Sequence, residues 1–164
     1  LVSLVILQNL VVNIPNKFVT KNIEESLIYY KDKKDIDSFI GDKSDLSRSL
    51  SVHYWTDCVT LNIIHNIDTN ESLRSQILMN FYDSSSQNMC KDLDATVNGN
   101  ESANVDYSRY WHGTILYIKP LLMIMNIKEI KIFTFILLLV KLTVSIVLSL
   151  YITFITPPVK SNVS

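Results

Sequence analysis

Two short stretches hold the side chains best suited to chemistry, and the first is residues 107–113. These residues read YSRYWHG and include Arg109, Trp111 and His112. Arginine offers a fork of N–H donors to a phosphate, and an indole offers a flat face on which a ligand can stack. The run therefore predicts contacts to a lipid phosphate or a sugar. The alternative is an aromatic belt at a membrane surface, with one hydrogen-bonded histidine.

The second stretch contains Asp57, the candidate catalytic residue. Asp57 lies in the sequence WTDC, at the predicted start of a helix, where a neighbouring aromatic could bury the carboxylate partly and suit it to acid–base work. Its alternative role is to stabilise the helix dipole. His53 and His65 are close in sequence, but their spacing is generic, so we predict no metal site. No phosphate-binding glycine loop, CxxC or HExxH motif occurs, and the cofactor stays unknown.

Cys58 and Cys90 are the two cysteines of the chain. They could form a disulfide in an oxidising compartment, but no larger cysteine framework accompanies them. We expect instead that Cys58 is a small buried residue and that Cys90 lies in a loop.

The element with the strongest signal is an apolar stretch at residues 132–155, which contains one charge, Lys141. As a helix it measures roughly 36 Å, enough to cross the ~30 Å hydrocarbon core of a bilayer. A lysine facing lipid at mid-depth costs on the order of 2.5–3.5 kcal/mol. Lys141 begins a stripe that Ser145, Ser149 and Thr153 continue at every fourth residue. These hydroxyls either bond to their own helix backbone or pack against other spans.

Two shorter apolar stretches are predicted to associate with the membrane. Residues 1–14 are uncharged and too short to span, and we expect the end of a truncated anchor helix. A signal peptide is the less favoured alternative, because residues 13–16 form a poor cleavage site. Residues 114–126 contain Lys119 and Pro120, and they are predicted to form a short membrane-associated or spanning helix, with a helix buried among other helices as the alternative.

Residues 15–113 form a polar region between these segments, and residues 156–164 form a tail. The polar region is predicted to be helical, with no convincing strand pattern. Its expected parts are a helix at 22–30, a loop at 31–50, a helix at 52–67, a further helix ending near Phe81, and a mobile loop at 83–104.

Charge is distributed unevenly along the chain. Residues 13–113 contain ten Lys or Arg against fifteen Asp or Glu, a net charge of −5, whereas the remainder toward the C-terminus is net +4. No basic stripe with interleaved aromatics is present, so we expect no nucleic-acid partner. Lysine placement next to the apolar stretches favours a multi-pass protein of the cell membrane with residues 15–113 on the extracytoplasmic side.

The motifs also resemble a known family. WTDC at 55–58 with the downstream NID at 66–68, and YSRYWHG at 107–113 followed by KPLL at 119–122, are similar to the N-terminal part of an uncharacterised family of multi-pass membrane proteins from Gram-positive anaerobes. The resemblance covers most of the chain. Those proteins have an anchor helix, a long outer loop and many further spans, an arrangement similar to the GT-C glycosyltransferases that use polyprenyl-phosphate sugars. In that class an acidic residue of the first outer loop acts as base or metal ligand, and the resemblance assigns this role to Asp57.

Two functions follow as expectations for an all-α membrane protein in contact with the lipid bilayer. One is the N-terminal part of a GT-C-like glycosyltransferase, in which Asp57 performs acid–base work and Arg109 and His112 contact the phosphate of a lipid-linked sugar. The other is a non-catalytic, membrane-anchored extracytoplasmic module that binds other membrane helices.

Overall fold

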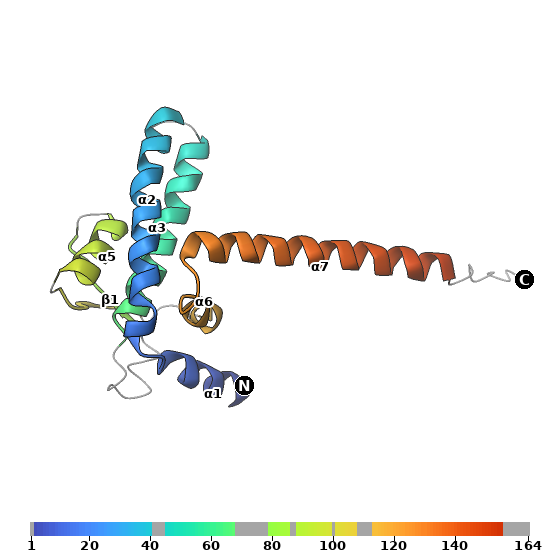
Figure 1. Ribbon diagram of the computed structural model, residues 1–164, viewed down its shortest axis with the longest axis horizontal. Coiled ribbons are helices and arrows are strands. Elements are labelled where there is room, and N and C mark those ends of the chain that lie inside the picture. Colours follow the sequence, from blue (N-terminus) through green and yellow to red (C-terminus); the bar gives the residue numbers. More distant parts are fainter. Residues whose placement is uncertain are drawn as a thin grey trace, which may run out of the picture. The chain divides into compact units, whose positions relative to one another are not determined.

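A computed structural model describes most of the chain and is shown in Figure 1. The residues that it describes are 2–40, 45–67, 79–85, 88–99, 101–107 and 113–155. Within them the structure is mostly helical, as expected, with one short strand pair that the sequence did not predict. The chain divides into two compact units, residues 1–130 and 131–164, which are described separately.

The first unit contains nearly all of the described elements. In chain order they are α1 (Val2–Val12), the 3₁₀ helix η1 (Asn16–Phe18), α2 (Thr20–Ile40), α3 (Asp45–His65), β1 (Asn80–Phe81), α5 (Met89–Asn98), β2 (Val105–Asp106) and α6 (Ile115–Leu121). The last helix, α7 (Ile127–Ile155), begins in this unit and continues through the described part of the second.

The helices α2 and α3 supply much of the core of the first unit. In α2, Ile23, Leu27 and Tyr30 are buried and recur every three or four residues, so they form one face of the helix. In α3, Cys58 and Leu61 are fully buried and lie three residues apart, so they share one face of the helix. The two helices lie side by side in Figure 1 and contact each other.

Both helices are longer than predicted. The expected loop at 31–50 is wrong for most of its length, because α2 continues to Ile40 and α3 begins at Asp45. Lysine is a good helix former, and no glycine or proline interrupts the chain between Pro15 and Gly41. A charged, serine-containing composition was therefore a poor indicator of loop here.

The predicted loop at 83–104 is also wrong, because it contains α5. Asn88 caps this helix, its side-chain oxygen accepting a hydrogen bond from the backbone N–H of Lys91 at 3.2 Å. Met89 and Leu93 are buried, which identifies the face of α5 that packs on the core. The predicted helix ending near Phe81 lies mostly outside the described residues, but its last residues form strand β1, which pairs antiparallel with β2.

The buried side chain of Asn62 in α3 is hydrogen-bonded to the chain directly after strand β1. Asn62 is fully buried, donates to the Tyr82 carbonyl at 3.0 Å and accepts from the Tyr82 N–H at 3.1 Å. Both backbone groups are thereby satisfied where water is excluded. These hydrogen bonds hold the segment that precedes α5 against α3. From the sequence alone, Asn62 would be taken for an ordinary polar surface residue.

The segment predicted as a short membrane-associated helix contains α6, which has seven residues and is therefore about 10 Å long. Its Lys119 is fully buried, and the ammonium donates to the Val12 carbonyl at the end of α1 at 2.8 Å. Carbonyls at a helix C-terminus lack intrahelical partners and carry partial negative charge, so a lysine stabilises this helix end. Burial lowers the pKa of Lys119 to about 8.

The N-terminus of α7 is defined by a reciprocal capping box. The Asn126 side chain accepts from the Glu129 N–H at 3.1 Å, and the Glu129 carboxylate accepts from the Asn126 N–H at 2.9 Å. Ser26 of α2 also accepts a hydrogen bond from the Ile127 N–H at 3.0 Å. These caps start the helix at Ile127, five residues before the apolar stretch predicted at 132–155 begins.

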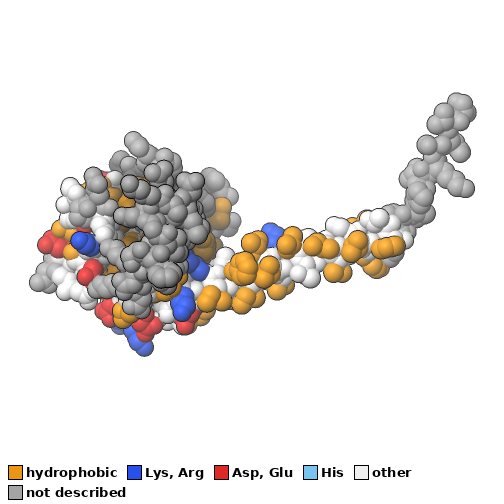
Figure 2. Space-filling model, turned by 90° about the horizontal axis from the view of Figure 1, so that it is seen from above, with side chains coloured by type: hydrophobic (Ala, Val, Ile, Leu, Met, Phe, Trp, Pro, Cys, Tyr) orange, Lys and Arg blue, Asp and Glu red, His pale blue; other side chains and the backbone are white. Residues whose placement is uncertain are grey.

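Among the described helices, one is long and apolar enough to cross a membrane, and it comprises residues Ile127–Phe154 of α7. Figure 2 shows hydrophobic side chains along its length, and they are exposed from Ile132 onward. The hydroxyls of the polar stripe bond to their own helix backbone, as in the first of the two alternatives given above, and packing against other spans stays a prediction. Ser145, Ser149 and Thr153 each donate to the carbonyl four residues earlier, at 2.8–2.9 Å.

Candidate functional site

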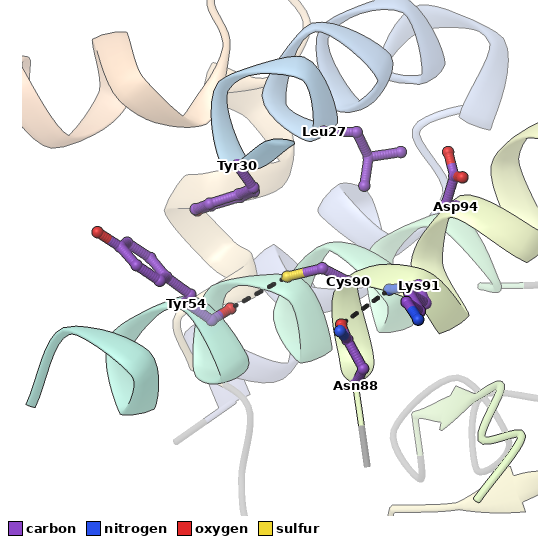
Figure 3. A pocket seen from close by; sticks show the side chains of 7 residues that line it. All are labelled: Leu27, Tyr30, Tyr54, Asn88, Cys90, Lys91 and Asp94. Atoms are coloured by element: carbon purple, nitrogen blue, oxygen red, sulfur yellow. Dashed lines mark hydrogen bonds between the residues drawn. The ribbon is translucent and has the colours of Figure 1, made fainter. Parts of the chain in front are cut away.

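A cavity of about 320 Å³ lies between α2, α3 and α5 in the first unit. Figure 3 shows the side chains around it. The residues that line it are Leu27, Tyr30, Tyr54, Asn88, Cys90, Lys91 and Asp94. Its volume is at the lower end of the range typical of small-molecule pockets.

The wall between α3 and α5 is held by a disulfide between Cys58 and Cys90. The expectation that the cysteines stay unpaired is therefore wrong, as is the placement of Cys90 in a loop. Cys58 is fully buried, as expected. The Cys90 sulfur also lies 3.8 Å from the Tyr54 main-chain oxygen, along a dashed line in Figure 3. A disulfide sulfur carries no hydrogen, so we describe this approach as a packing contact.

The lining combines an apolar part with a polar edge. Leu27 supplies aliphatic surface, and the rings of Tyr30 and Tyr54 lie 5.7 Å apart with their planes tilted by 58°. Lys91 and Asp94, one turn apart on α5, contribute opposite charges. Such a lining suits a small ligand that has an apolar or flat face and a polar rim.

Asp57 is half-buried on α3, next to the disulfide residue Cys58. Burial raises the pKa of the Tyr30 hydroxyl above its ordinary value, and the charge and hydrogen bonding of the nearby Asp57 carboxylate raise it further. Because Tyr30 lines the cavity, Asp57 is coupled to the cavity through this tyrosine. The helix begins at Asp45, so the alternative role of Asp57 as a carboxylate at the helix start is wrong.

The other predicted site residues cannot be placed beside Asp57. Arg109, Trp111 and His112 lie outside the described residues, as does the side chain of His53. His65 is partly buried at the end of α3, and burial lowers its pKa. No group of three or more His, Cys, Asp or Glu side chains that could hold a metal occurs in the part of the chain that the structure describes.

Sequence reasoning missed the contribution of α5 to this site. A signal was present: Met89, Leu93 and Val97 recur every fourth residue, and Asn88 is a suitable helix cap. The surrounding Ser, Asn and Asp content obscured it. In α2, the spacing of Ile23, Leu27 and Tyr30 indicates a shared helix face, but nothing local indicates that this face borders a cavity.

The chain was compared with known proteins in three ways, and none gave a match. No family model, no curated protein and no solved structure is significantly similar to it. Functional inference therefore depends on the chain's own residues.

Proposed function

We propose that the chain is the extracytoplasmic, disulfide-linked helical module of an integral membrane protein, held to the cell membrane by α7. The observation that carries the proposal is the Cys58–Cys90 disulfide in a chain that also contains a long apolar helix. Structural disulfides persist in oxidising compartments and are rare in the cytosol. A module with both features fits the outer side of a membrane, where its cavity is open to small ligands.

Two further observations support this placement. The polar region is net acidic, with five more acidic than basic residues between positions 13 and 113. α6 is much shorter than the ~30 Å hydrocarbon core, which favours a topology in which it does not cross the bilayer. The proposed topology has residues 15–113 outside and α7 running inward toward the cytoplasm.

Thiol labelling in intact cells tests the topology. We expect Cys58 and Cys90 to resist a membrane-impermeant maleimide until a membrane-impermeant reductant is added, and Cys90 then to react in unbroken cells. A Cys58→Ser variant isolates Cys90, and the double serine variant measures background labelling. Labelling that requires cell lysis, with no dependence on the reductant, would place the module in the cytoplasm and refute the proposal.

The second candidate function is sugar transfer from a polyprenyl-phosphate carrier, by a GT-C-like enzyme of which this chain forms the N-terminal part. The observation that favours it is the half-buried Asp57, coupled through Tyr30 to a cavity with aromatic and polar lining. A carboxylate in such a setting can accept a proton from an attacking hydroxyl. In this proposal Arg109, Trp111 and His112 contact the carrier phosphate or the sugar.

Transfer of labelled sugar in membranes that contain the intact protein distinguishes the two candidates. Removing a general base lowers turnover by about 100-fold or more, so Asp57→Asn should do so if Asp57 is catalytic. Asp106→Asn, at an exposed position of β2, is the matched control. No transfer by the unmodified protein leaves the non-catalytic module as the function. Equal transfer by Asp57→Asn and the unmodified protein would show that Asp57 is not the general base.

A further inference from the structure

The apolar part of α7 contains a single charged side chain, Lys141, close to its middle. Nine residues separate it from Ile132, the nearer end of the apolar stretch, which corresponds to about 14 Å along a helix. A lysine stem extends roughly one helical turn, about 5–6 Å, so Lys141 cannot bring its ammonium to the interface by snorkelling alone.

The other polar residues of the stripe that contains Lys141 have small side chains, and their hydroxyls are hydrogen-bonded within α7. The hydroxyls of Ser145, Ser149 and Thr153 donate to backbone carbonyls of their own helix. Their side chains therefore add little bulk to this face, and another helix can approach it closely. Lys141 is exposed, and no ion pair to it occurs among the described residues. An ammonium inside the hydrocarbon requires an anionic or polar partner there.

We infer that this face of α7 binds a further membrane helix, one that carries an aspartate or glutamate at mid-depth. The carboxylate neutralises Lys141, and the small Ser145 and Ser149 side chains let the two backbones come together. The partner helix does not come from this sequence, because residues 1–14, 114–126 and 132–155 contain no Asp or Glu. A second copy of α7 is excluded on the same face, since it would bring two Lys141 ammonium groups together.

The inference rests on the proposed membrane insertion of α7, so the test measures insertion and association separately. The full chain, labelled with a donor fluorophore, is reconstituted in lipid vesicles. Two synthetic leucine-rich helices of matching length, one with a central glutamate and one with a central glutamine, carry the acceptor. Protection of α7 from added protease reports insertion, and energy transfer reports association.

We expect the glutamate helix to associate with the chain about tenfold more strongly than the glutamine helix. Lys141→Leu should remove this difference, and Lys141→Arg should retain it. Lys131→Leu, which removes a lysine near the helix end, should leave it unchanged. Equal binding of the two helices, or a preference that survives Lys141→Leu, would overturn the inference while leaving insertion intact. Loss of protease protection in the unmodified chain would refute the membrane proposal itself.

Discussion

Replacing Lys119 by methionine should abolish a specific pH dependence of stability. Lys119 is fully buried, and burial lowers its pKa to about 8, whereas the unfolded chain retains the ordinary value near 10.5. Between these values the unfolded state binds more protons than the folded state, so stability rises with pH. The penalty for a charged Lys119 is fully present below about pH 8 and disappears as the pH approaches about 10.5.

The pKa difference sets the size of the effect. A fall from 10.5 to about 8 corresponds to roughly 3 kcal/mol of lost stability at neutral pH. Of this, about 2 kcal/mol should be regained between about pH 7 and pH 9.5. Methionine has a similar length and no charge, so it removes the penalty. It also leaves the Val12 carbonyl without its hydrogen bond, at a cost of about 1–3 kcal/mol.

Chemical unfolding of the purified chain in detergent, followed by helical circular dichroism, measures the difference. The Lys119→Met variant should be as stable as the unmodified chain, or more stable, at about pH 7, and less stable at about pH 9.5. Three other groups of the described residues have shifted pKa values, and they titrate outside this interval. The pKa of His65 is lowered by burial from 6.5, and the pKa values of Tyr30 and Tyr82 are raised above 10.

Lys21→Met provides the control, because its side chain is 83% exposed. The free energy of unfolding of this variant should follow that of the unmodified chain across the whole interval. If the free energy of unfolding of Lys119→Met has the same pH dependence as that of the unmodified chain from about pH 7 to pH 9.5, Lys119 does not titrate as described. The account of its burial against α1 would then be refuted.

Three further variants test the packing of α3, α5 and the segment that joins them. Asn62→Leu removes both hydrogen bonds to the Tyr82 backbone and should destabilise the chain by about 2–4 kcal/mol in chemical unfolding; an unchanged midpoint would contradict that role. Gly99→Ala would bring its Cβ into steric conflict with the backbone carbonyl oxygen of Ala95 in α5, so we expect a loss of about 1–3 kcal/mol. A melting temperature equal to that of the unmodified chain would refute this packing. The Cys58→Ser/Cys90→Ser double variant opens a loop with a sequence separation of 32 and should lose about 3–4 kcal/mol in free energy of unfolding, as should the unmodified chain on reduction. No loss in either case would show that the disulfide does not stabilise the fold.

Local patterns in the sequence were sufficient for α7 and for the buried face of α3, but not for the full lengths of α2 and α3. The apolar stretch of α7 is recognisable because length and hydropathy alone decide whether a helix can cross a bilayer. The buried face of α3 follows from the spacing of Cys58 and Leu61, since residues three or four apart share a helix face. These properties depend on neighbours along the chain, so one sequence reveals them.

The candidate site could be predicted only in part. The catalytic role of Asp57 stays a prediction, and its coupling to Tyr30 depends on the pairing of two helices. The residues of α5 were missed because a polar composition outweighed a weak periodicity. Arg109, Trp111 and His112 stay predictions, because they lie outside the described residues.

The sequence by itself therefore determined a mostly helical chain with one helix able to span a membrane, together with the polar stripe on that helix. Only the tertiary structure decided that Cys58 pairs with Cys90, that α5 completes a cavity, and that Lys119 is buried against the end of α1. Each of these three features joins segments that are distant in sequence. Helix periodicity shows which face of a helix is apolar, but it does not specify which other segment covers that face.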